Sequence, residues 1–430
     1  MADVASRSDR SIESLAAACS KAARQVANLS TARKNRVLNH MADALLDHQD
    51  AILDANDTDV EGAQSNGLPE AMIDRLVLNE GRLQKMATAL REVAGFSDPV
   101  GQMSATTTRP SGIEVGRMRI PLGVIAMIYE ARPNVTSDAA GLCFKAGNAV
   151  FLRGGSEAFH VNHAIARALH EALEAGDVDP AAITLVPTTD RAAVQEMLTM
   201  NQHIDLVIPR GGEGLIRFVD ETSRIPVIKH YKGVCHLYVD AEANLDIADD
   251  LLIDGKTSRP SVCNALETLL VHEEVADAYV PRACALLREA GVTIRGDDKV
   301  RARVTDVEPA TEEDYAAEYL DLTIAMRVVE EAEAAQQHIS TYGSNHTEVI
   351  VTDNLLRARE FVRTVDASVV LVNASSRFSD GGELGLGAEI GISTTKLHAY
   401  GPMGLQALTT EKFVVYGAGE TRHPVPKRSE

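Results

Sequence analysis

The sequence predicts an α/β protein with two lobes, each built on a parallel sheet, and a small β-hairpin. Three observations predict this class. From residue 124 onward, short apolar segments alternate with longer segments of helical spacing, as in parallel strands covered by helices. A second block of the same kind follows residue 263, and 430 residues are enough for two or more lobes. The Thr-rich stretch 105–120 lies outside both blocks.

The N-terminal part is predicted to be helical. Over residues 11–95, apolar side chains recur at helical spacing, and the helices are expected to form a structural collar: Leu38, Met41, Leu45, Leu46, Ile52 and Leu53. Residues 105–120 predict an extended pair with a turn near Ser111 and Gly112.

The first α/β block is predicted to hold four strands, at residues 124–129, 149–152, 183–186 and 205–208. Helices are expected at residues 137–145, 160–173 and 192–199, and another from residue 215. Parallel sheets of this kind bind nucleotides at the carboxyl ends of their strands.

The second block is predicted to hold strands at residues 267–271, 322–328, 348–351 and 368–372, with a helix at 330–338. Residues 375–404 are rich in Gly and polar side chains, and so long a connection is usually functional or disordered. A closing strand is expected at residues 410–416.

Composition excludes several classes of protein. The net charge of −20 disfavours nonspecific nucleic-acid binding, and without a run of 18 apolar residues no membrane span is expected. Five scattered cysteines with no CxxC pair argue against a zinc ribbon and a disulfide framework, and for a reducing cytoplasm. His160 and His163 lack an acidic companion, so no metal site is expected.

Cys263 is the candidate nucleophile. It lies in RPSVCNALETLLVH, after the polar segment 254–261 and before an apolar, β-prone strand, where a loop end presents a thiol on a rigid support. The alternative is a small buried hydrophobe, the usual role of a free cysteine. That packing role is predicted for the other four: Cys19, Cys143, Cys235 and Cys284.

Two glycine motifs follow predicted strands. They are RGGS at residues 153–156 and RGGEG at 210–214, whereas no GxGxxG follows the first strand. Glycines at a strand-to-helix junction let backbone N–H groups approach a phosphate. Ordinary turn chemistry explains each motif equally well when it is taken singly.

Four long segments resemble the aldehyde dehydrogenase superfamily, and within it the branch that reduces an acyl phosphate: residues 120–158 (from IPLGVIAMIYEARPNVT to RGGSEA), 259–272 (RPSVCNALETLLVH), 338–351 (HISTYGSNHTEVIV) and 391–417 (from GISTTKLHAYGPMG to KFVVYG). The resemblance implies two Rossmann-like lobes. It implies a collar and cofactor-binding domain at 1–104 and 120–254, a catalytic domain at 255–395, and oligomerisation strands at 105–119 and 405–418.

The resemblance also implies a reaction. A member of this branch reduces L-glutamyl 5-phosphate with NADPH to L-glutamate 5-semialdehyde and phosphate, through a thioester on Cys263, in proline biosynthesis. The expected location is the cytoplasm. The expected partners are further copies of the chain in a homo-oligomer and, transiently, glutamate 5-kinase.

Further site residues follow from the same resemblance. Arg153 and Gly154 stand where the superfamily contacts the adenosine ribose and its phosphate. Gly211, Gly212 and Glu213 match the loop over the pyrophosphate, Glu318 the Glu that holds the nicotinamide ribose, and Asn134 is nearest to the oxyanion-hole Asn. Charge-assisted donors for the substrate's anionic groups are expected from four residues, each of which could instead be a solvated surface charge: Arg132, Arg259, Lys396 and His398.

Smaller assignments complete the site. Arg259 and Lys256 are expected to lower the pKa of the thiol. Asp138 and Glu130 could be general bases, but the favoured interpretation is that Asp138 caps a helix and Glu130 is a polar strand end. Where hydrolytic relatives carry a water-activating Glu, this chain has KHYKGVCH, with His230 or a neighbour in its place.

Three alternatives to this function stay open at this point. The absent Glu disfavours a hydrolytic semialdehyde dehydrogenase of the same fold. A cysteine acyltransferase without nicotinamide would not bind NADPH. A non-catalytic scaffold would carry an unreactive Cys263.

Overall fold

The computed structural model describes residues 11–423, the side chain of Ala71 excepted. The first ten residues of the predicted collar domain lie outside this range. The chain divides into two compact units. Unit 1 comprises Met1–Gly211, Arg217–Ile228 and Gly404–Glu430, and unit 2 comprises Gly212–Ile216 and Lys229–Met403.

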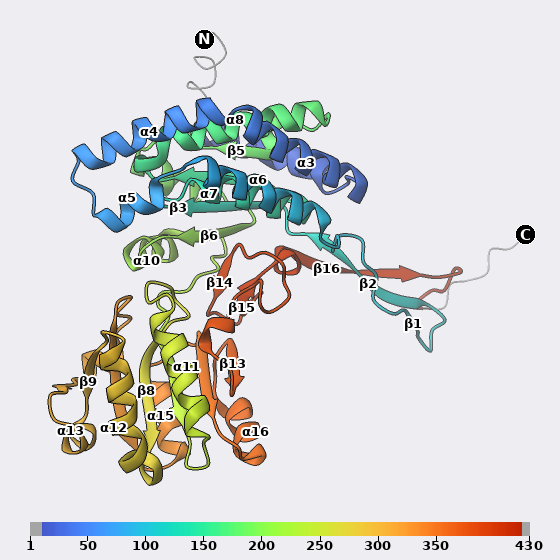
Figure 1. Cartoon of the computed structure of the whole chain (residues 1–430). Coiled ribbons are helices and arrows are strands. Elements are labelled where there is room, and N and C mark those ends of the chain that lie inside the picture. The colour runs from blue at the N-terminus through green and yellow to red at the C-terminus, as the bar shows by residue number, and fades with distance from the viewer. Residues whose placement is uncertain (1–10, 424–430) are drawn as a thin grey trace, which may run out of the picture. The chain divides into compact units, whose positions relative to one another are not determined.

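Unit 1 begins with the predicted helices, and helices over residues 11–95 are confirmed. They are α2 (Ile12–Val26), α3 (Thr31–Asp47), α4 (Gln49–Ser65), α5 (Glu70–Leu76) and α6 (Glu80–Gly95). Side-chain oxygens of Ser11, Ser30 and Asn79 cap the starts of α2, α3 and α6. Helix α3 packs against α6 and against α8 (Phe159–Ala175) (Figure 1). Its buried Lys34 is paired with Asp98 at 2.9 Å.

A four-stranded parallel sheet forms the centre of unit 1, in the order β5-β4-β3-β6. Its strands are β3 (Val124–Tyr129), β4 (Ala149–Gly154), β5 (Ile183–Leu185) and β6 (Leu206–Arg210). The remaining helices are α7 (Asn134–Lys145), α9 (Arg191–Met197), and the short η1 (Ser156–Ala158) and η2 (Pro180–Ala182), while α10 (Glu213–Thr222) belongs to unit 2 up to Ile216 and to unit 1 from Arg217. All four predicted strands are present, and every residue of β3 is buried, which explains its uninterrupted apolar sequence.

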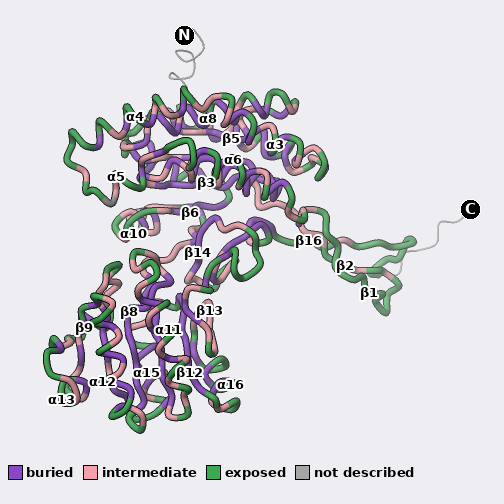
Figure 2. Tube along the Cα trace, in the orientation of Figure 1, coloured by how far each residue is buried: buried purple, intermediate pink, exposed green. Residues whose placement is uncertain are grey.

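The predicted hairpin forms an antiparallel arm of unit 1, which we call the arm. It has the order β1-β2-β16, with β1 (Thr107–Thr108), β2 (Glu114–Pro121) and β16 (Thr409–Tyr416). Gly112, at the predicted turn, has a φ of +94°, a conformation that glycine adopts without strain. Figure 2 shows that most of the arm is exposed, whereas the parallel sheet of the same unit is buried.

Unit 2 contains a seven-stranded parallel sheet in the order β10-β9-β11-β8-β7-β12-β13. Its strands are β7 (Cys235–Val239), β8 (Leu266–His272), β9 (Thr293–Gly296), β10 (Glu308–Pro309), β11 (Thr323–Val329), β12 (Thr347–Val351) and β13 (Val369–Val372). Its helices are α11 (Leu245–Thr257), α12 (Glu273–Glu289), α13 (Asp298–Arg303), α14 (Glu312–Tyr315), α15 (Ala332–Tyr342), α16 (Leu355–Thr364) and η3 (Ser376–Phe378). In unit 1, the short η4 (Leu405–Leu408) precedes β16.

The structure corrects the prediction in three places. Because β7 pairs with β8 and β12, residues 229–254 belong to unit 2, and the predicted boundary at 254/255 lies too late in the chain. Helix α11 continues to Thr257, so only residues 258–265 separate it from β8. The segment 375–404, predicted to be a functional or disordered connection, contains the antiparallel pair β14 (Gly391–Ser393) and β15 (Gly401–Met403).

No helix within residues 11–423 is long and apolar enough to cross a membrane.

Candidate active site

Cys263 lies in the short irregular segment between α11 and β8. A turn closes there, with the N–H of Ala265 donating to the carbonyl of Val262 at 3.0 Å. Cys263 is half-buried, whereas Cys19, Cys143, Cys235 and Cys284 are all buried. The predicted packing role of those four is confirmed, and Cys263 is the cysteine with a solvent-accessible position.

The backbone of Cys263 is tightly held by the segment that precedes β7. The thiol of Cys235 donates a hydrogen bond to the carbonyl oxygen of Cys263, with Sγ and O 3.2 Å apart. A Cβ at Gly233 would lie 2.7 Å from the Cα of Cys263, so only glycine fits there. The N–H of Gly233 donates in turn to Oε1 of Glu318 at 2.9 Å.

A histidine pair lies beside Cys235: His346 is close to its thiol, and the ring of His230 is close to that of His346. Nδ1 of His346 lies 3.9 Å from Sγ of Cys235, and the rings of His346 and His230 are 6.1 Å apart. Burial lowers the pKa of His346 to about 3, so the ring is neutral at neutral pH. His230, predicted to replace the water-activating Glu, is thus part of the Cys235 surroundings.

The residue after the cysteine is held from another direction. The side-chain amide of Asn264 donates to the carbonyl of Ser379 at 3.0 Å. The hydroxyl of Ser379 accepts from Thr347 at 2.8 Å. The turn is therefore contacted directly by β7, through Cys235, and by Ser379, which follows η3 and is itself bonded to Thr347 of β12.

Lys256 does not have the role that was predicted for it. Its Nζ lies 2.7 Å from Oε2 of Glu267, and both side chains are fully buried. The ammonium group is engaged by this carboxylate, so Lys256 is not a free cation for the Cys263 thiolate.

In unit 1, several predicted residues share the carboxyl edge of the sheet. Strand register places Gly154 beside Tyr129 on one side and Arg210 beside Tyr129 on the other. Arg132 lies in the short segment between the end of β3 and the start of α7. The sheet therefore brings Gly154 of the first glycine motif and Arg210 of the second to one edge, where parallel sheets bind ligands.

Asn134 is the first residue of α7, and its amide donates to Oδ2 of Asp138 at 2.8 Å. The predicted cap role of Asp138 is wrong, because α7 begins three residues earlier than expected and places Asp138 in its second turn. Pro133 permits the earlier start, since proline suits the beginning of a helix. Burial raises the pKa of Asp138 to about 6, against the opposing effects of Asn134 and Arg210.

The cofactor candidates differ in their surroundings. An Nη of Arg153 donates to the carbonyl of Thr189 at 2.8 Å, and its buried Nε has no hydrogen-bond partner among the described residues. A Cβ at Gly154 would overlap the amide of Asn162. At Gly212, by contrast, a Cβ would meet no described atom within 4 Å. Gly211 joins β6 to Gly212.

Glu213 and Glu318 are both connected to the KHYKGVCH segment within unit 2. Nζ of Lys232 lies 3.8 Å from Oε2 of Glu213. Burial raises the pKa of Glu318, while its hydrogen bond from Gly233 and the charge of Lys232 act in the opposite direction.

Three predicted substrate ligands are on exposed segments. Lys396 pairs with Asp366 at 2.7 Å, and Arg259 and His398 are exposed. His398 has a φ of +74° in the loop between β14 and β15.

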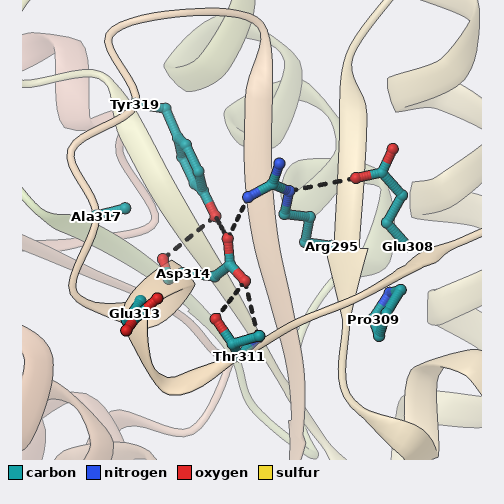
Figure 3. A pocket seen from close by; sticks show the side chains of 8 residues that line it. All are labelled: Arg295, Glu308, Pro309, Thr311, Glu313, Asp314, Ala317 and Tyr319. Atoms are coloured by element: carbon teal, nitrogen blue, oxygen red, sulfur yellow. Dashed lines mark hydrogen bonds and ion pairs between the residues drawn. The ribbon is translucent and has the colours of Figure 1, made fainter.

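A cavity of about 540 Å³ is lined in part by Ala317 and Tyr319, the two sequence neighbours of Glu318 (Figure 3). Figure 3 shows Arg295 pointing at Asp314, with Nη1 and Oδ1 2.5 Å apart, and the hydroxyl of Tyr319 donating to the same carboxylate at 3.0 Å. These groups satisfy one another, and none of the predicted site residues lines the cavity. Within residues 11–423, no group of three or more His, Cys, Asp or Glu could hold a metal ion.

Sequence reasoning missed the contacts that hold Cys263. Gly233, Cys235 and His346 were not predicted as site residues. One signal was available: Gly233 and Cys235 lie directly before and at the start of the apolar strand that contains Cys235.

A parallel sheet in each unit, together with an accessible cysteine held in a turn of unit 2, defines the class of the molecule as an α/β protein with a candidate thiol nucleophile. The sequence pattern of the aldehyde dehydrogenase family matches residues 1–323, and the chain belongs to that family. The predicted fold class and resemblance are thereby confirmed.

Relatives within the family are gamma-glutamyl phosphate reductases. The one from Salinibacter ruber is 74% identical over 417 residues, which make up 97% of this chain and 96% of that protein. The one from Xanthomonas campestris is 58% identical over 413 residues, covering 96% of this chain and all of that protein. The crystal structure of the Thermotoga maritima gamma-glutamyl phosphate reductase has a TM-score of 0.95 at 44% identity, covering 96% of this chain and 100% of that one. The chain is thus an oxidoreductase, as predicted.

Proposed function

We propose that this protein reduces L-glutamyl 5-phosphate with NADPH, giving L-glutamate 5-semialdehyde and phosphate in proline biosynthesis. One observation carries the proposal. Of the five cysteines, only Cys263 lies outside the core, and its backbone is held by Cys235 and Gly233. A fixed, accessible thiol suits covalent catalysis, and relatives that are 74% and 58% identical are named for this reduction.

In the proposed reaction, Sγ of Cys263 attacks the carbonyl carbon of the acyl phosphate. The C–S bond forms as the C–O bond to phosphate breaks, and phosphate leaves with that electron pair. NADPH, when bound, supplies the hydride that reduces the resulting thioester. The electron pair of the C–S bond then returns to Cys263, which releases the aldehyde and restores the thiolate.

The residues of the two glycine motifs fit a dinucleotide. The Cα of Gly212 borders open space directly before α10, where a pyrophosphate could approach the start of the helix. The unpartnered Nε of Arg153 leaves a buried cationic donor available to a phosphate. Glu318 would hold the nicotinamide ribose with its carboxylate, one oxygen of which already accepts from Gly233.

The sequence of this segment supports reduction over hydrolysis: KHYKGVCH contains no Glu at the place where hydrolytic relatives carry the water-activating one. Anionic groups of the substrate would be bound by Arg132, Arg259, Lys396 and His398, and Asn134 would stabilise the oxyanion. The protein's arm presents Phe413, Val415 and Tyr416, which supports assembly into a homo-oligomer.

The reverse reaction tests the function. NADPH formation from glutamate 5-semialdehyde and NADP should rise with added phosphate or arsenate and vanish without it, because general-base help with water is worth about 10²–10⁴-fold. Brisk NADPH formation in phosphate-free buffer, with glutamate as product, would instead indicate a hydrolytic dehydrogenase. A protein that does not bind NADPH in a titration would be a transferase.

A further inference from the structure

The carbonyl oxygen of Cys263 accepts a hydrogen bond from a side chain that lies 28 residues earlier in the chain. The donor is the thiol of Cys235, at 3.2 Å. Cys235 is the first residue of β7 and is fully buried. A thiol is only a weak donor. Even so, this one contacts the peptide of the candidate nucleophile, so Cys235 does more than fill space in the core.

The surroundings of Cys235 keep its proton in place. Burial raises the pKa of this thiol well above its ordinary value, and the nearby carboxylates of Glu348, Glu267 and Glu318 act in the same direction. Cys235 therefore stays protonated at neutral pH, where it can donate but cannot act as a nucleophile.

Gly233 restrains the same backbone. Its Cβ position would lie 2.7 Å from the Cα of Cys263, and its N–H is fixed by Glu318. Gly233 and Cys235, two positions apart in the chain, thus both contact the peptide that carries the proposed nucleophile.

We propose that Cys235 is a positioning residue for Cys263: its thiol hydrogen bond, together with the contact of Gly233, fixes the Cys263 peptide in the geometry that the reaction requires. The inference rests on the proposed function, because it takes Cys263 to be the nucleophile. A misplacement of a reacting group by about 1 Å can cost on the order of 10²-fold in rate, so one hydrogen bond at this point has a measurable effect.

The chain provides a matched control. Cys284 is also fully buried in unit 2, and its Sγ lies 4.0 Å from Sδ of Met326 rather than near Cys263. Cys284→Ala removes the same atoms from the same unit, so it reports the effect of a small cavity alone. Cys235→Ser keeps a hydroxyl donor and tests rescue of the hydrogen bond.

The experiment compares kcat and KM of the full chain and three variants in the reaction with NADP, phosphate and glutamate 5-semialdehyde. Cys235→Ala should lower kcat by roughly tenfold to a hundredfold and leave KM within about twofold, because positioning acts on the chemical step. Cys235→Ser should recover kcat to within about threefold of the original protein, and Cys284→Ala should match that protein.

A second measurement separates positioning from loss of stability. The rate of alkylation of Cys263 by iodoacetamide is measured at a series of pH values by mass spectrometry of the Cys263 peptide. The pH dependence of this rate gives the titration midpoint of the thiol. Cys235→Ala should move that midpoint upward by about half a pH unit, because the released carbonyl can turn its negative end toward the thiolate. Cys235→Ser and Cys284→Ala should not move it.

Equal kcat values and equal midpoints for Cys235→Ala and Cys284→Ala would overturn the proposal. A folded Cys235→Ser with the low kcat of the Ala variant would also overturn it, and this arm applies even if Cys235→Ala does not fold. Activity of Cys263→Ala would be a different failure, that of the proposed function itself.

Discussion

Lys256 and Glu267 form an ion pair that is buried from solvent. Lys256 precedes the Cys263 turn in the sequence, and Glu267 follows it. Nζ and Oε2 are 2.7 Å apart, and neither side chain has any exposed surface. Lys256 belongs to the last turn of α11 and Glu267 is the second residue of β8, so the pair joins the two elements that flank residues 258–265. Oε1 of Glu267 also accepts from the N–H of Leu320 at 3.3 Å.

Breaking this pair on one side should destabilise unit 2 strongly. Lys256→Met leaves a buried carboxylate without its cation, and we expect a loss of about 3–5 kcal/mol in the free energy of unfolding by urea. Lys256→Met with Glu267→Gln should recover most of that loss, since Gln is neutral and keeps an acceptor for Leu320. Lys299→Met, which breaks a half-exposed pair with Glu273, is the control and should cost about 1 kcal/mol or less. A loss for Lys256→Met as small as the control's would contradict the expectation.

Cys263→Ala should remove essentially all turnover, because the thioester cannot form, and should leave the circular dichroism spectrum unchanged. Cys143→Ala, in the core of unit 1, should retain turnover and lower stability by about 1 kcal/mol. If Cys263→Ala turned over at a near-normal rate, the proposed mechanism would be wrong.

Arg153→Ala should weaken binding of NADPH more than that of NADH, because the guanidinium suits the extra phosphate. Titration of both cofactors by fluorescence measures the two dissociation constants. Arg91→Ala breaks an ion pair with Asp43 that joins α6 to α3, and it should change neither dissociation constant. Equal losses for NADPH and NADH would show that Arg153 does not distinguish them.

Stability should fall as the pH is lowered from about 6.5 toward 3, and His346 should contribute to that fall. Burial lowers its pKa from 6.5 to about 3, so between these values the unfolded chain binds a proton that the folded protein does not. One such group changes the free energy of unfolding by about 1.4 kcal/mol per pH unit. Urea unfolding at pH 7, 6 and 5 should show a shallower dependence for His346→Gln. His423→Gln, at an exposed position, is the control, and identical slopes for both variants would refute the assignment.

The arm should carry the contacts between copies of the chain. Phe413 and Tyr416 are 66% and 59% exposed, large values for aromatic side chains. Phe413→Glu with Tyr416→Glu should lower the molecular mass seen by sedimentation without unfolding the protein. Leu355→Glu with Leu356→Glu, on the exposed start of α16, is a matched control. An unchanged mass for the arm variant would place the contacts elsewhere.

Local patterns were sufficient for most of the fold. The uninterrupted apolar run of β3, the helical spacing in α3 and the turn at Gly112 each depend on residues that are close in sequence. The predicted boundary near residue 254 was wrong because β7 is short, and only its pairing with β8 and β12 shows which sheet it joins.

The sequence by itself determined the two α/β blocks, the arm, the family and the choice of Cys263 as candidate nucleophile. Only the tertiary structure decided what holds that cysteine. Gly233 meets Glu318, 85 residues later, and Cys235 meets Cys263, 28 residues later. Likewise, Lys256 is an ordinary basic residue in the sequence, and only folding buries it against Glu267. Periodicity reports how a residue faces its own helix or strand, whereas these contacts depend on which strands become neighbours, and that follows from packing the whole sheet.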